Sequence, residues 1–203
     1  MPNPLTTVVV LALLLIAGLP SVAHANAGVP MLVLILPGGA LSLPLVILIE
    51  AAFLRRLGLD RLRSLKLSAF VNAASTLFGV PVTWFVLWVV EMLGGSLVWR
   101  LVVGKGAQPH ELWQKIFVVL WSAPWLVPLR DEPTPWMLPA ATLALLIPFF
   151  FVSYAIEAHL MERALPHENL ARVRQVVWRA NIVTYSTFAA ATLAWLLFTR
   201  GAA

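Results

Sequence analysis

Four long apolar runs dominate the pattern of hydrophobic and polar positions along the chain. They cover residues 29–54, 67–93, 137–154 and 180–198. Each is close to the roughly 20 apolar residues that a helix needs to cross a bilayer. The pattern predicts an all-α protein, a polytopic transmembrane helical bundle with four mature spans. The first run contains Pro37, the pair Gly38-Gly39 and Pro44, so we expect a kink or a late helix start there.

A further apolar run, Leu5–Leu19, lies near the amino terminus and is followed by Ala23-His24-Ala25. Small residues at 23 and 25 are typical of a signal peptidase site, which predicts a signal peptide over residues 1–25. No Lys or Arg precedes the run, so a retained first transmembrane helix is the alternative. Both interpretations leave residues 21–28 outside the cytoplasm.

Basic residues concentrate in two linkers between the apolar runs. Residues 55–66 hold five Lys or Arg and residues 155–179 hold four, out of 14 in the whole chain. Positive charge beside spans marks the cytoplasmic side of a membrane. We therefore expect both linkers to face the cytoplasm, in the cytoplasmic (inner) membrane of a bacterial type of cell.

This orientation divides the chain into a first transmembrane hairpin, residues 26–93, and a second, residues 137–203. The intervening segment, residues 94–136, is expected outside the cytoplasm. Its apolar stretch over 112–129 is short and contains two prolines, which favours an interfacial or re-entrant helix. If that stretch crossed the membrane, the second half of the chain would be inverted.

Composition narrows the function classes. The chain is 61% hydrophobic and 11% charged, against about 25% charged in ordinary soluble domains. It has no cysteine, which excludes disulfides, thiolate metal sites and cysteine nucleophiles. Phosphate-binding glycine loops, nucleophile elbows and zinc-type histidine motifs are absent from the sequence. We therefore expect no catalytic residue, no metal and no cofactor, and the few excess positive charges do not indicate nucleic-acid binding.

The two hairpins resemble each other. Ile49-Glu50-Ala51 precedes the first linker and Asn72 follows it, while Ile156-Glu157-Ala158 precedes the second linker and Asn181 follows it. Such an internal repeat would relate the hairpins by an axis along the membrane normal. Chance similarity between two apolar hairpins is the alternative.

Ionisable residues at membrane depth are costly and are functional candidates by default. Glu50, Asn72, Glu157 and Asn181 form the candidate intramembrane polar site, with each carboxylate accepting a hydrogen bond from the amide across its hairpin. The alternative is that these pairs only stabilise the fold of each hairpin. Each pair would then contribute on the order of 1 kcal/mol to stability.

Small and hydroxylated residues recur on the second span at helical spacing. Ser75, Thr76, Gly79 and Thr83 would share one face with Asn72. Small residues let helices approach closely, so we expect a helix-packing face there.

The stretch Leu45–Trp84 resembles the filament-integrity membrane proteins of filamentous cyanobacteria. The resemblance is carried by Ile49-Glu50-Ala51, Asn72, Ser75 and Gly79. It implies a multi-pass protein at cell–cell septa, needed for intercellular communication, with no assigned enzymatic activity.

These observations favour a non-enzymatic integral membrane protein that acts as a scaffold or accessory subunit of a membrane assembly. Its expected partners are the lipid bilayer and other membrane-protein subunits, or further copies of itself. The alternative is a small transporter or channel with a polar site around Glu50 and Glu157. A membrane enzyme acting on lipids is a third hypothesis. The sequence names neither the partner nor the substrate, and it leaves the oligomeric state open.

Overall fold

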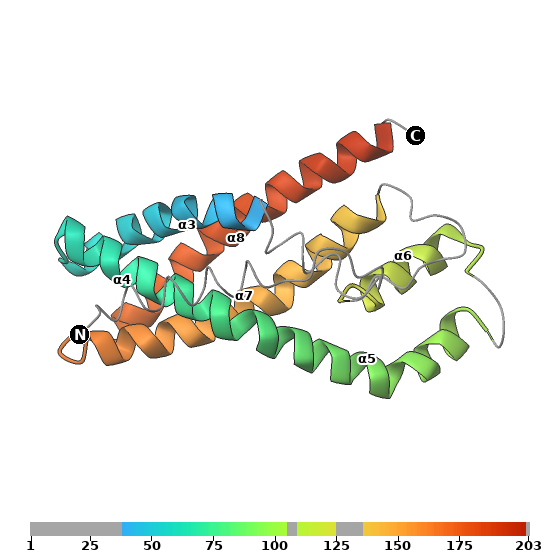
Figure 1. Ribbon diagram of the computed structural model, residues 1–203, viewed down its shortest axis with the longest axis horizontal. Coiled ribbons are helices and arrows are strands. Elements are labelled where there is room, and N and C mark those ends of the chain that lie inside the picture. Colours follow the sequence, from blue (N-terminus) through green and yellow to red (C-terminus); the bar gives the residue numbers. More distant parts are fainter. Residues whose placement is uncertain (1–37, 105–108, 125–135, 202–203) are drawn as a thin grey trace, which may run out of the picture.

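The computed structural model describes residues 38–104, 109–124 and 136–201, and every regular element in those ranges is a helix (Figure 1). The elements are α3 (Gly38–Leu54), the 3-10 helix η1 (Arg55–Leu57), α4 (Arg61–Ala74), the π-helical segment η2 (Ser75–Gly79), α5 (Val80–Val102), α6 (Leu112–Trp121), α7 (Met137–Ala164) and α8 (Leu170–Gly201). The predicted all-α class is confirmed for this part of the chain. The predicted signal peptide or first helix, residues 1–25, lies outside the described residues.

Helices α3, α4, α7 and α8 pack in a ring in which each contacts two neighbours. Helix α3 contacts α4 and α8, and α7 contacts the same two helices from the other side. The α3–α4 and α7–α8 turns lie at the same end of the molecule, on the left in Figure 1. There the Arg172 guanidinium donates a hydrogen bond of 2.8 Å to the carbonyl oxygen of Arg56. The two basic linkers therefore lie side by side, while the side of the membrane that they face remains a prediction.

Three helices are long and apolar enough to cross a membrane: Arg61–Val102, Met137–Ala164 and Leu170–Thr199. They support a membrane protein with transmembrane helices. Helix α3 has 17 described residues. Residues 29–37 of the expected first span lie outside the described part of the chain, so the fourth span stays a prediction.

The second apolar run forms a much longer helix than the predicted span, residues 67–93. Residues 61–102 are continuously helical through α4, η2 and α5. The helix begins early because the Asp60 side chain caps it, accepting a hydrogen bond of 2.9 Å from the backbone N–H of Arg63. Residues 61–66 of the predicted 55–66 linker thus belong to α4, and the chain reverses before it at Gly58, whose φ of 83° favours glycine.

The second linker is also shorter than predicted. The expected span ended at Tyr154 and the linker covered residues 155–179, but α7 continues to Ala164 and α8 begins at Leu170. No glycine or proline interrupts residues 155–164. Pro166 then prevents continuation of the helix, because proline has no N–H to donate and disfavours the helical conformation of the residue before it.

Helix α6 occupies part of the segment in which an interfacial or re-entrant helix was expected. It has 10 residues, or about 15 Å at 1.5 Å per residue, which is half of a bilayer core. Glu111 and Gln114 form a capping box at its start, and the helix packs against α5 and α7. Helix α6 is therefore too short to cross, while residues 125–135 lie outside the described part.

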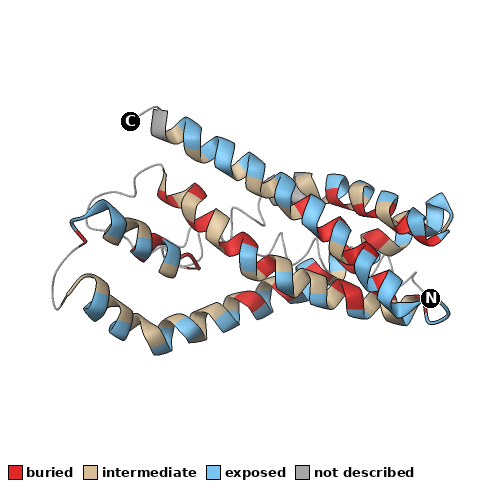
Figure 2. Ribbon diagram, turned by 180° about the vertical axis from the view of Figure 1, so that it is seen from behind, coloured by how far each residue is buried: buried red, intermediate tan, exposed pale blue. Residues whose placement is uncertain are grey.

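Buried residues, red in Figure 2, run along α7 and its neighbours, and the apolar ones form two clusters. One cluster includes Val119, Ala141 and Leu145, between α6 and the first half of α7. The other surrounds Met161 and Val173 near the two turns. The polar residues described next lie near the second cluster, on the faces through which the four helices of the ring meet.

Candidate functional site

Each helix of the ring contributes one polar side chain of the candidate intramembrane site. Glu50 comes from α3, Asn72 from α4, Glu157 from α7 and Asn181 from α8. All four are at most 5% exposed. The structure thus places all four predicted residues inside the bundle, not on its lipid-facing surface.

Within each hairpin, the asparagine amide donates to the glutamate carboxylate. Asn72 Nδ2 donates to Glu50 Oε2, and Asn181 Nδ2 donates to Glu157 Oε2 over 2.7 Å. These are the hydrogen bonds expected across the hairpins. The two hairpins therefore place the same pair of residue types in the same donor–acceptor relationship.

A third contact joins the two hairpins. Ser75 Oγ, at the start of η2, donates to Glu157 Oε1 over 2.9 Å. Ser75 Oγ also lies 3.2 Å from the backbone carbonyl oxygen of Asn72, the residue whose side chain binds Glu50. The pairs are consequently parts of one polar centre (the carboxylate centre: Glu50, Asn72, Ser75, Glu157 and Asn181), not two separate locks.

Backbone carbonyls and a buried serine orient the amides of the carboxylate centre. Asn72 Nδ2 also donates to the Ser68 carbonyl over 3.0 Å, and Asn181 Nδ2 to the Val177 carbonyl over 3.2 Å. Ser68 Oγ donates to the Ile47 carbonyl of α3 over 3.0 Å. Because the amide N–H groups are directed at the carboxylates, the identity of the nitrogen atoms follows from the network.

The carboxylate centre lacks a cationic partner among the described side chains. The ion pair in the described residues joins Arg174 to Glu162 outside the centre. No group of three His, Asp or Glu side chains that could hold a metal ion occurs in the described ranges. Asn181 Oδ1 and Thr184 Oγ1 are buried without a hydrogen-bond partner. The centre thus combines two carboxylates and an unpaired amide oxygen inside the bundle.

The predicted helix-packing face is only partly buried. Ser75, Gly79 and Thr83 are buried, but Thr76 is exposed. The buried positions Asn72, Ser75, Gly79 and Thr83 form one stripe that runs through η2, and Thr76 lies beside this stripe. Gly79 lies against α7, where a Cβ atom would come within 3.5 Å of Ile156 Cδ1.

Sequence reasoning assigned Ser75 to packing alone and did not include Ser68, which contacts the Asn72 amide, in the site. The sequence did carry a signal for Ser68, because it precedes Asn72 by four residues and thus lies one turn away on the same face. The hydrogen bond of Ser75 could not be predicted from the sequence, because its partner Glu157 is 82 positions away.

Comparison with known proteins finds no matching family model, no matching curated protein and no matching solved structure.

Proposed function

We propose that this protein is a small integral-membrane transporter, or the ion-handling subunit of one, that binds a proton or another small monovalent cation at the carboxylate centre. The observation that carries the proposal is that Glu50 and Glu157, from different hairpins, are linked inside the bundle through Asn72 and Ser75. Intramembrane carboxylates facing a bundle interior mark ion pathways and proton relays.

Charge balance supports this proposal. Two ionised carboxylates near each other repel, and an apolar enclosure strengthens that repulsion. The donors to Glu50 and Glu157 are the neutral side chains of Asn72, Asn181 and Ser75. Neutral donors stabilise a carboxylate without cancelling its charge, so a proton or a bound cation is the natural counter-charge.

The donor set also suits a small cation. Carboxylate and amide oxygens are hard ligands, and Asn181 Oδ1 is an acceptor with no donor in the described chain. The residues of the centre are nearly sealed from the surface. Passage of the cation therefore needs a second conformation or a partner subunit, as alternating access at a fixed site requires.

Flux through proteoliposomes tests the proposal. Purified protein is reconstituted with a trapped pH dye, and a potassium diffusion potential is imposed with valinomycin. Parallel vesicles carry a sodium-sensitive dye, which separates proton from sodium movement. We expect flux of one of these cations above that of empty vesicles, and its loss in both Glu50→Gln and Glu157→Gln.

A matched control is Glu168→Gln, the same chemical change in the α7–α8 turn outside the centre. It should leave the flux unchanged. Glutamine retains an acceptor for each asparagine amide, and in Glu157→Gln its NH2 group can donate to Ser75 Oγ, so the variants keep hydrogen-bond partners while removing the charge. Wild-type flux no greater than that of empty vesicles, or equal flux in wild type and both centre variants, would refute the transport proposal.

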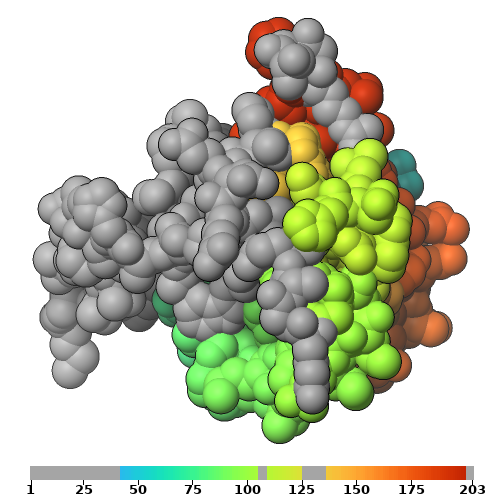
Figure 3. Space-filling model, turned by 90° about the vertical axis from the view of Figure 1, so that its right-hand side faces the viewer, coloured from blue at the N-terminus to red at the C-terminus, as the bar shows by residue number. Residues whose placement is uncertain are grey.

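A second candidate is the scaffold or accessory subunit, in line with the resemblance to filament-integrity proteins. It is favoured by the last part of α8, where no residue from Tyr185 to Thr199 is buried. This part of the helix extends away from the ring (Figure 1), and its red tip forms the top of the molecule in Figure 3. Large apolar side chains such as Leu197 and Phe198 are exposed on it.

Either lipid or a partner subunit can cover such a helix. Crosslinking in native membranes distinguishes the two. The chain lacks cysteine, so a single Leu197→Cys variant carries one crosslinkable thiol. A defined product of higher mass, absent for a cysteine in place of Glu168, would support the scaffold. Unmodified monomer in both variants would count against it.

A further inference from the structure

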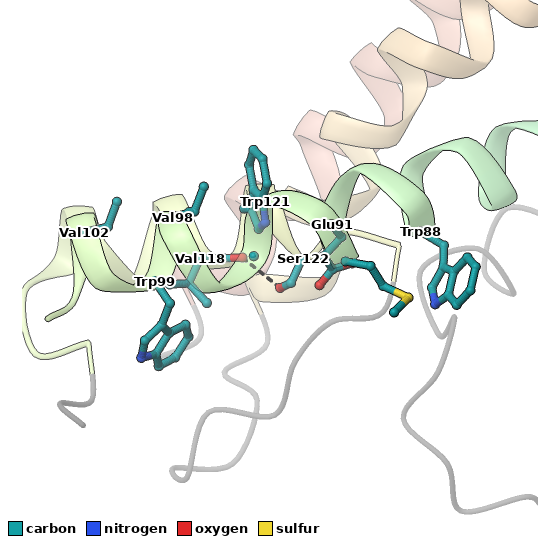
Figure 4. Close-up of a pocket in the computed structure, with 10 residues that line it drawn as sticks. Trp88, Glu91, Val98, Trp99, Val102, Val118, Trp121 and Ser122 are labelled. Carbon is teal, nitrogen blue, oxygen red and sulfur yellow. Dashed lines mark hydrogen bonds between the residues drawn. The ribbon is translucent and has the colours of Figure 1, made fainter. Parts of the chain in front are cut away.

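A cavity of about 410 Å³ lies between α5 and α6, away from the carboxylate centre. This volume is in the range of small-molecule sites. Its walls are mostly apolar and include the indoles of Trp88, Trp99 and Trp121. Figure 4 shows Trp88 and Trp99 on either side of Glu91 along α5, and Trp121 on the facing helix.

Glu91 is the acidic side chain among the cavity residues, and no basic side chain lines the cavity with it. Figure 4 shows that it reaches from α5 towards Ser122, next to the end of α6. Glu91 Oε2 is buried without a hydrogen-bond partner in the described chain. A buried acceptor without a donor is costly unless a ligand or water satisfies it.

The absence of a side chain at Gly95 leaves room for the cavity. Gly95 lies one helical turn after Glu91 on the same face of α5, and a Cβ atom built there meets nothing within 4 Å. The neighbouring Gly94 is different, because a Cβ atom there would come within 2.8 Å of Trp121 Cζ2. One glycine therefore permits the α5–α6 approach, and the other leaves the cavity open.

We propose that this cavity binds an organic cation with an apolar body, held by the Glu91 carboxylate and the surrounding indole rings. A cation is attracted both to a carboxylate and to the faces of tryptophan rings, and these attractions strengthen when water is excluded. An anionic ligand would be repelled by the Glu91 carboxylate, and a neutral apolar ligand would leave that carboxylate without a partner. The site is independent of the carboxylate centre and of the transport proposal.

Equilibrium dialysis against tetraphenylphosphonium tests the assignment on the full chain in lipid nanodiscs, with empty nanodiscs subtracted. Tetraphenylborate, an anion of the same shape, is measured in parallel. We expect saturable binding of the cation at one site per chain and no saturable binding of the anion. Glu91→Gln should weaken cation binding by at least about tenfold, the loss of a charge-assisted contact.

Gly95→Leu is the second variant, because it fills the cavity while keeping the Glu91 charge. It should abolish the saturable binding, whereas Glu157→Gln, in the carboxylate centre, should leave it unchanged. Undiminished binding in Glu91→Gln or in Gly95→Leu would overturn the assignment. So would cation uptake equal to that of empty nanodiscs, or saturable binding of the borate at comparable affinity.

Discussion

Ser75 donates a hydrogen bond to Glu157 across 82 positions of sequence, and this contact joins the two hairpins of the bundle at their shared polar centre. Ser75 lies at the start of the π-helical segment η2. Such segments inside α-helices occur frequently at functional sites. The contact turns two similar hairpins into one structure with a common buried pair of carboxylates.

Replacing Ser75 by alanine should destabilise the folded protein, because Glu157 Oε1 loses its donor while it remains buried. We expect a loss on the order of 1 kcal/mol, read as a lower midpoint of thermal unfolding in detergent. The matched control is Thr76→Ala, one residue along on the exposed surface, which should shift the midpoint far less. Equal shifts in the two variants would contradict the assigned role of Ser75.

Gly94 and Gly95 should respond oppositely to alanine. Gly94→Ala places a Cβ atom 2.8 Å from Trp121 Cζ2, so the indole ring or the helix must shift, an overpacking cost of about 1–3 kcal/mol. Gly95→Ala enters open space and gains helix propensity, up to about 1 kcal/mol. Unfolding midpoints check both changes. Adding Trp121→Ala should relieve the Gly94→Ala defect, and failure of that rescue would show that the Trp121 contact is not its cause.

Gly79 should tolerate alanine but not leucine. An alanine Cβ would contact Ile156 and Val152 at 3.5 Å, an ordinary packing distance. Leucine would push η2 away from α7 and lengthen the bond from Ser75 to Glu157. We expect Gly79→Ala to fold with nearly unchanged thermal stability and Gly79→Leu to lose about 1–3 kcal/mol or more. A Gly79→Leu protein as stable as the wild type would refute the close approach of these helices.

The two basic turns should be labelled from the same side of the membrane. The chain has no cysteine, so the single variants Arg56→Cys, Arg172→Cys and His110→Cys each carry one reporter thiol. An impermeant maleimide should modify Arg56→Cys and Arg172→Cys only in inside-out vesicles, and His110→Cys only in right-side-out vesicles. Labelling of the Arg172→Cys variant from outside would overturn the predicted cytoplasmic placement of this turn.

The hairpin pairing was readable from the sequence because it depends on local geometry. A glutamate near the end of one span and an asparagine early in the next are brought together when the chain reverses between them. The hydrogen bonds of Asn72 to Glu50 and of Asn181 to Glu157 follow from that reversal. The start of α4 and the end of α7 were harder to predict from the sequence. Asp60 and Pro166 set them within the basic linkers, where hydropathy is low.

By itself, the sequence determined the helical class, the membrane character and the two chain reversals, because apolar run length and basic linkers act locally along the chain. Only the tertiary structure decided that the two Glu–Asn pairs form one carboxylate centre and that Glu91 lies in an indole-lined cavity. Those outcomes depend on how close the helices approach. That approach depends on Gly79 against α7 and on Gly94 against Trp121, which are contacts between residues far apart in the chain.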